Sequence, residues 1–258
     1  MSKDALSVRQ KEFYEKRTRT YLPRRTYTII RIDGKAFHTY TKSLNKPFDE
    51  DLIEAMDSTA IYLCKNIQGA KLAYVQSDEI TIVMTDFDTL QTDAWFDGEV
   101  QKIVSVSASM ATREFNRVRI IQQLANGIDI KYILNGKLAE FDSRVFTIPF
   151  KEEVLNNIIW RQRDCVRNSI SSVAQSLFSH TLLTGKNQSD MQEMCFEKGV
   201  NWNDFPEKQK RGRVIIKKQI NYPSKNGGEP YIRNEWKSIA APDFNKDRSL
   251  FDEIFNFE

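Results

Sequence analysis

Two short acidic segments, far apart in the sequence, carry the residues best suited to chemistry. The first is the Asp33-Gly34 pair that ends the apolar run 26–33, and the second is Ser77-Asp78-Glu79, between two further apolar runs. Carboxylate oxygens suit Mg²⁺, which usually takes one or two protein carboxylates and leaves its other positions to water and substrate phosphates. Two such ions can hold the attacking and leaving oxygens of a phosphoryl or nucleotidyl transfer. If folding brings the two segments together, the sequence predicts a metal-dependent transferase site.

The elements around these segments predict that they do meet. The hydrophobic patterns predict strands at 26–33, 71–78, 79–86 and 139–149, and helices at 49–69 and 97–116. This is the β-α-β-β-α-β order of a ferredoxin-like fold, in which strand three returns antiparallel beside strand one. The end of strand one then lies beside the turn between strands two and three, so Asp33, Asp78 and Glu79 should converge at one edge of the sheet.

Three carboxylates at one edge repel each other unless a cation lies among them. Gly34 lacks a Cβ, so its backbone could approach a metal or a triphosphate. These features are typical of an α+β polymerase-type palm. The competing interpretation is an ordinary Asp-Gly turn with a polar-tipped hairpin, and the pattern alone leaves both open. The second acidic pair, Asp86 and Asp88, is expected in a loop at the far edge.

The C-terminal half is less regular. Segment 118–137 is ambiguous, and we make no prediction for it. A long helix is expected at 151–178, with Trp160 in the core, followed by a short helix near 189–197 and strands near 213–220 and 231–238. We therefore expect residues 1–150 to form a palm-like catalytic domain with a basic N-terminal segment, and residues 151–258 to form a long helix and an appendage packed on the palm.

Composition narrows the class of protein. No apolar run is long enough to span a membrane, and no apolar segment near the N-terminus could serve as a signal peptide. Three scattered cysteines indicate a reduced, cytoplasmic protein without a zinc site, and two histidines disfavour a Ser-His-Asp triad. Basic residues gather in 1–25, in 207–218 and on the long helix, which indicates a polyanionic partner or a merely solvated surface. The candidate RNA contacts are Arg161, Arg163, Arg167, Lys208, Lys210, Arg211 and Arg213.

Five blocks in order resemble the tRNAHis guanylyltransferase family and its relatives, the 3′-5′ nucleic-acid polymerases. They are "RIDGKAFHTYTKSLNKPFD", "AYVQSDEITIVM", "FDSRVFTIP", "WRQRDCVRNSI" and "KRGRVIIKKQ". The resemblance implies a palm with a family-specific C-terminal region. It also implies an enzyme that activates a tRNA 5′-monophosphate with ATP and then joins it to the 3′-hydroxyl of an incoming nucleoside triphosphate. Expected partners are tRNA, ATP and GTP or other nucleoside triphosphates, and the expected assembly is a homotetramer.

The resemblance also implies roles for individual residues. Asp33 and Asp78 would ligate two Mg²⁺ ions with the Gly34 carbonyl, and Glu79 would have a lesser catalytic role. Lys46 and Ser77 match positions of the activation step. The remaining candidates are nucleotide or phosphate contacts: Arg31, Lys35, Ala36, Phe37, His38, Lys102 and Arg144.

The sequence departs from the family pattern at three positions. Val166 stands where the tRNAHis-specific branch has a histidine, Phe48 stands where an asparagine is common, and Glu99 occupies a position expected to be basic. Val166 favours the branch that adds nucleotides opposite a template and repairs 5′-truncated tRNAs. The alternative within the family is addition of G at position −1 of tRNAHis. More remote alternatives are a nucleotidyl cyclase, against which the basic segments argue, and a non-catalytic RNA-binding palm, against which the retained acids argue.

Overall fold

One antiparallel sheet organises the protein. The computed structural model describes residues 4–223 and 231–256, and within them six strands follow the order β4-β1-β3-β2-β5-β6. The strands are β1 (Tyr27–Gly34), β2 (Ala70–Gln76), β3 (Glu79–Met84), β4 (Phe141–Ile148), β5 (Arg213–Tyr222) and β6 (Tyr231–Ala240). The first four strands have the predicted ferredoxin-like order, with β1 between β3 and β4. The expected palm is therefore confirmed.

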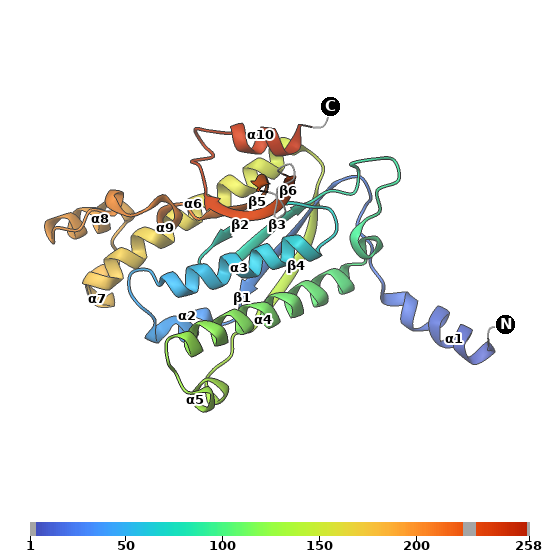
Figure 1. Ribbon diagram of the computed structural model, residues 1–258, viewed down its shortest axis with the longest axis horizontal. Coiled ribbons are helices and arrows are strands. Elements are labelled where there is room, and N and C mark those ends of the chain that lie inside the picture. The colour runs from blue at the N-terminus through green and yellow to red at the C-terminus, as the bar shows by residue number, and fades with distance from the viewer. Residues whose placement is uncertain (1–3, 224–230, 257–258) are drawn as a thin grey trace.

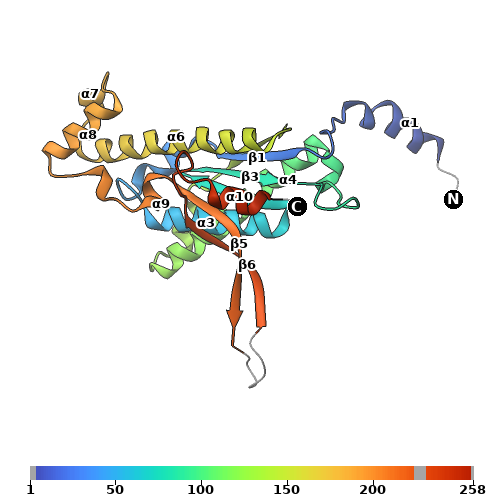
Figure 2. The ribbon, with the colours of Figure 1, turned by 90° about the horizontal axis from the view of Figure 1, so that it is seen from above.

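Long helices cover both faces of the sheet. Helices α3 (Glu50–Asn66) and α4 (Val100–Ala125) pack on one face, and α6 (Lys151–Leu177) lies on the other (Figures 1 and 2). One hydrophobic cluster fills the α3 and α4 side, and a second lies under α6 and α10 (Ser249–Phe255). Because both faces are covered, β2 and β3 are buried along almost their whole length.

The start of α3 shows how local sequence determines where a helix begins. Asp49 caps the helix by accepting a hydrogen bond from the Leu52 amide at 2.8 Å, and Glu50 and Asp51 lie in the first turn. Acidic groups there interact favourably with the positive end of the helix dipole. Asp49 also accepts a bond from the Asn45 amide at 3.1 Å, so the same carboxylate fixes the loop before the helix.

Segment 118–137, left open above, is mostly helical. Its first part continues α4, and a short helix, α5 (Ile130–Asn135), follows with Asp129 accepting a bond from the Lys131 amide at 2.7 Å. The remaining short elements are α1 (Ala5–Phe13), α2 (Phe37–Tyr40), α7 (His180–Leu183), α8 (Gln188–Glu197), α9 (Glu207–Lys210) and the 3-10 turns Glu15–Thr18, Thr41–Ser43, Trp95–Gly98 and Trp202–Asp204. Helix α1, which has no buried residue, projects away from the body (Figures 1 and 2).

The C-terminal strands join the sheet directly. Strand β5 pairs with β2, from Leu72 opposite Ile216 to Val75 opposite Arg213. Beyond this pairing, β5 and β6 continue as a hairpin that projects from the body (Figure 2). Within the described residues, no helix is long and apolar enough to cross a membrane.

Candidate active site

The predicted acidic edge forms as expected. Asp33 lies near the end of β1, directly opposite Glu79 on β3, and Asp78 lies in the two-residue turn between β2 and β3. Residue Ser77 of this turn has a φ of 44°, a left-handed conformation that is uncommon for a residue with a side chain. The turn therefore holds Asp78 at the same edge as Asp33.

A further carboxylate lies at this edge. Asp142 on β4 is the partner of Asp33 on its other side, so three acids form a row across β4, β1 and β3. Asp142 was not among the acids predicted from the sequence. The pairing of β4 with β1 places Asp142 and Arg144 on the face that carries Asp33 and Arg31.

Burial and mutual repulsion raise the pKa values of the central acids. The pKa of Asp33 rises from 3.8 to about 6, mainly through burial and then through the charges of Asp78, Glu79 and Asp142. Burial also raises the pKa of Asp78, against an opposing hydrogen bond from Ser77. An ionised pair at this position is therefore unfavourable unless a cation approaches.

Glu79 is different because its charge is already matched. Arg161 of α6 donates to both carboxylate oxygens of Glu79, at 2.8 and 2.6 Å, and Arg31 Nε lies 3.7 Å from Oε1. Glu79 and Arg161 are both largely shielded from water, with side chains 9% and 11% exposed. Such a bidentate pair anchors α6 to the sheet edge and leaves Glu79 with little capacity to bind a metal.

Trp160 covers this ion pair from outside. Its indole lies 4.9 Å from the guanidinium of Arg31 and 4.8 Å from that of Arg161, and the residue is 51% exposed. The expectation that Trp160 belongs to the core is therefore wrong. The two cations hold it at the surface, where the ring face is attracted to positive charge.

Gly34 has a packing role. A Cβ there would come within 2.7 Å of Phe37 Cγ and still closer to the edge of that ring. Phe37 itself is buried, in edge contact with Phe115, and Ala36 adopts a left-handed φ of 51° to begin α2. Lys35 pairs with Glu140 at 2.6 Å. The glycine thus allows the chain to turn tightly under the acidic edge.

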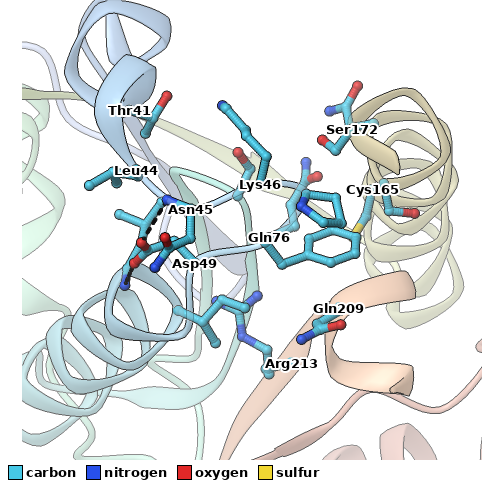
Figure 3. A pocket seen from close by; sticks show the side chains of 17 residues that line it. Thr41, Leu44, Asn45, Lys46, Asp49, Gln76, Cys165, Ser172, Gln209 and Arg213 are labelled. Carbon is cyan, nitrogen blue, oxygen red and sulfur yellow. Dashed lines mark hydrogen bonds between the residues drawn. The ribbon is translucent and has the colours of Figure 1, made fainter. Parts of the chain in front are cut away.

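A cavity of about 160 Å³ adjoins the hairpin turn (Figure 3). Lys46 and Asn45 project from the loop before α3, while Cys165 and Ser172 come from α6 on the opposite wall and Gln209 and Arg213 come from the C-terminal region. Ser77 is also a lining residue, so the cavity lies directly beside Asp78. The polar lining also includes Gln76, at the end of β2, and Asn168 and Ser169 of α6. The sequence alone does not indicate the α6 residues, because only the fold brings that helix to the cavity.

Other predicted contacts are divided between the two ends of the sheet. Arg144 is exposed and lies opposite Arg31, so both cations are close to Asp33. His38 is exposed on α2, just after the turn. Lys102, in contrast, lies in the first turn of α4. That turn lies beside the segment that precedes β1, because the Val100 amide donates a hydrogen bond to the Thr20 carbonyl (Figure 1). In a single chain Lys102 is therefore far from Asp33, and it lies 3.8 Å from Glu99.

The predicted RNA-binding cations are mostly engaged within the protein. Arg213 pairs with Asp57 at 2.7 Å and is buried, as is Lys210, which pairs with Glu207 at 2.8 Å. The other pairs join Arg161 to Glu79, Arg167 to Asp164, Lys208 to Glu50 and Arg211 to Glu207. Arg163 is exposed and donates to Asn245 at 2.9 Å. The structure thus does not form these residues into one free basic surface.

The rival acidic pair has a structural role. Asp86 accepts from Arg24 Nε at 2.6 Å and from the Arg25 amide at 2.8 Å, and Asp88 accepts from Thr85 at 2.6 Å. These bonds fix the segment before β1 to the end of β3. They support the expectation that this pair is not the metal site.

Comparison with known proteins identifies the family. The family model described as tRNAHis guanylyltransferase (Thg1) matches residues 7–149. The chain belongs to the tRNAHis guanylyltransferase family. It is 32% identical to the uncharacterized protein R259 of Acanthamoeba polyphaga mimivirus over 90% of this chain and 84% of that protein. It is 27% identical to the tRNA(His) guanylyltransferase of Debaryomyces hansenii over 74% of each chain.

Solved structures of this family match most of this chain. A bacterial tRNA(His) guanylyltransferase (Thg1)-like protein, in complex with ATP, matches with a TM-score of 0.82 and 45% identity, covering 97% of this chain and 98% of that one. The Saccharomyces cerevisiae tRNA(His) guanylyltransferase matches with a TM-score of 0.66 and 26% identity, covering 83% and 93%. This family member is accordingly a tRNA guanylyltransferase-like nucleotidyltransferase.

Proposed function

We propose that this enzyme is a template-dependent 3′-5′ nucleotidyltransferase that adds nucleotides to the 5′ end of tRNA, including truncated tRNA, after ATP activates the 5′-monophosphate. The observation that carries the proposal is the position of the Ser77-Asp78 turn. Ser77 lines the cavity with Lys46, while Asp78 faces the charge of Asp33. A nucleotide in the cavity would thus reach the acidic edge. Nucleotide substrates are supported by two similar solved structures of bacterial Thg1-like protein, one in complex with ATP and the other in complex with GTP.

Asp33 and Asp78 are the residues that would hold two Mg²⁺ ions, together with the Gly34 carbonyl. The raised pKa values of both acids fit this role, because a nearby cation would offset the burial and the neighbouring negative charge that disfavour their ionised forms. Within the described residues, no cluster of three or more His, Cys, Asp or Glu side chains could hold a metal alone. Substrate phosphates would complete the coordination, as Mg²⁺ sites commonly require. When bound, the ions would offset phosphate charge and activate the attacking hydroxyl.

The chain's own residues account for binding and orientation in both steps. In the first step a 5′-phosphate oxygen attacks the α-phosphorus of ATP, and pyrophosphate leaves. In the second, the 3′-hydroxyl of the incoming nucleotide attacks the activated 5′-phosphorus, and AMP leaves. Lys46 and Ser77 bind the triphosphate in the cavity, and Arg144 faces the phosphates from β4. The buried Arg31 adds positive charge from the adjacent strand β1. Fixed cations of this kind stabilise charge that develops during phosphoryl transfer.

Template-directed repair, rather than addition of G to tRNAHis, is favoured by Val166. Its side chain is half-buried and packs against a hydrophobic cluster that includes Ile170 and Trp202. An apolar group in that setting offers no hydrogen bond to an anticodon base.

The positions of Lys102 and of the cysteines bear on the assembly and on the cellular location. We propose a homotetramer, in which Lys102 would serve the site of a neighbouring copy because its own Asp33 lies at the other end of the sheet. Exposed cations, among them Arg163, would contact tRNA. The three buried, unpaired cysteines support a reducing, cytoplasmic compartment.

Nucleotide addition by carboxylate variants tests the proposal. Asp33→Asn and Asp78→Asn should each abolish addition to a 5′-truncated tRNA while circular dichroism stays unchanged. Asp93→Asn, at a side chain that is 85% exposed, is the matched control and should retain full activity. Addition at the wild-type rate by either active-site variant would overturn the assignment.

A further inference from the structure

A second cavity, of about 290 Å³, lies between α2 with its following turn, the C-terminal half of α4, and the α5 segment. It shares only Leu44 with the cavity beside Ser77. None of the residues assigned above to catalysis or nucleotide binding lines it. The activity of the family therefore does not explain it.

Arg119 is the unusual residue of this cavity. The residue is only 6% exposed, yet within the described chain its guanidinium makes one hydrogen bond, from Nη1 to Gln122 Oε1 at 2.9 Å, and no ion pair. Its Nε has no partner. Its neighbours on α4 behave differently, since Arg113 and Arg117 both pair with Glu114. Burying a guanidinium without an anion costs free energy. A ligand that brings a negative group to Arg119 would reduce that cost.

The other lining residues indicate what that ligand is. No Asp or Glu lines the cavity, and the second charged lining residue is Lys137, which is exposed after α5. Tyr40 and Tyr132 add aromatic surface. The amide of Asn116 is fully committed to Thr112 and Ala139, so that wall is rigid.

We propose that this cavity binds a phosphate monoester through Arg119 and Lys137, and that a nucleoside 5′-monophosphate is its preferred form. Two cations without a competing carboxylate select a dianion, because guanidinium and ammonium donors form charge-assisted hydrogen bonds to phosphate oxygens. The tyrosines provide faces for an aromatic base. The cavity is large enough for more than the phosphate alone.

Hydrogen exchange measured by mass spectrometry tests this site separately from the catalytic cavity. The full-length protein is titrated with AMP, inorganic phosphate or adenosine, and exchange is followed in peptides that cover 128–138. AMP should slow exchange there, phosphate should do so at higher concentration, and adenosine should have no effect. Equal protection by phosphate and AMP would keep the phosphate site but remove the preference for a nucleotide.

Two variants and a control complete the test. Arg119→Gln should weaken the AMP-dependent protection about ten- to a hundred-fold, the effect expected for one charge-assisted contact. Lys137→Gln should weaken it several-fold, and because Lys137 is exposed this variant decides the matter if Arg119→Gln does not fold. Arg113→Gln, which changes an exposed arginine of the same helix, should leave protection unchanged. Unchanged protection in Lys137→Gln and Arg119→Gln, or no protection by millimolar AMP in the wild type, would overturn the proposal.

Discussion

Replacing Asp33 with asparagine should stabilise the metal-free protein while removing its activity. The folded state raises the pKa of Asp33 from 3.8 to about 6, so folding disfavours the ionised carboxylate. A difference of this size corresponds to about 3 kcal/mol. Because Asp33 is only half-buried, solvent screening reduces the expected gain to about 1–2 kcal/mol.

The sign of the effect sets its pH dependence. Below about pH 3.8 the carboxyl is protonated in both the folded and the unfolded chain, and Asp33 has no influence on stability. As the pH rises towards 6 the unfolded chain ionises first, so wild-type stability falls relative to Asp33→Asn. About half of the full difference should be present at pH 5, and all of it at pH 8.

Urea unfolding of wild type and Asp33→Asn at pH 5 and pH 8, in EDTA, measures this directly. Asp93→Asn, at an exposed position, should show no gain at either pH. Adding Mg²⁺ should stabilise the wild type and not Asp33→Asn. A variant that is less stable than the wild type at pH 8 in EDTA would refute the argument that burial and the neighbouring acids together disfavour the ionised form of Asp33.

Three other measurements test the residues around the site and the binding of tRNA. Arg161→Met should lower the free energy of unfolding by about 3–5 kcal/mol, because it leaves the Glu79 carboxylate buried without its partner. Arg163→Met, at an exposed arginine, is the control and should change the free energy of unfolding by less than about 0.5 kcal/mol. Similar values for the two variants would contradict the role given to the Arg161–Glu79 pair. Gly34→Ala should cost about 1–3 kcal/mol by clashing with the Phe37 ring, and part of that loss should return in the double variant with Phe37→Leu; an additive double variant would show that the ring is not the obstacle. The Kd for tRNA should rise steeply between 50 and 200 mM salt through counterion release, and a flat response in a filter-binding assay would exclude a role for the basic residues.

Local pattern was enough to predict that the acids meet at one edge of the sheet. The strand that carries Asp33 near its end and the two-residue turn at Asp78 are defined by nearby residues, and the antiparallel pairing of β1 with β3 then brings them together. The ambiguity of segment 118–137 arose because α4 continues past its amphipathic part, with exposed Ile121 and Leu124 blurring the period.

Residues whose partners lie far away in the sequence could not be assigned. The cluster 207–218 suggested a basic surface, but Asp57 and Glu50 of α3 neutralise Arg213 and Lys208. Lys102 matched a family position, yet only the fold shows that α4 begins at the opposite end of the sheet from Asp33. In each case the charge and spacing of the residues can be read from the sequence, but only the fold shows which charged groups have partners.

The most direct test of the proposed function compares two 5′-monophosphorylated substrates, an intact tRNAHis and a tRNA that lacks its first 5′ nucleotide. Each is incubated with the enzyme, Mg²⁺ and all four nucleoside triphosphates, and the added nucleotides are identified by sequencing. The account predicts that the truncated tRNA gains the base complementary to its partner strand. Addition of a non-templated G to intact tRNAHis alone, with no extension of the truncated tRNA, would contradict it.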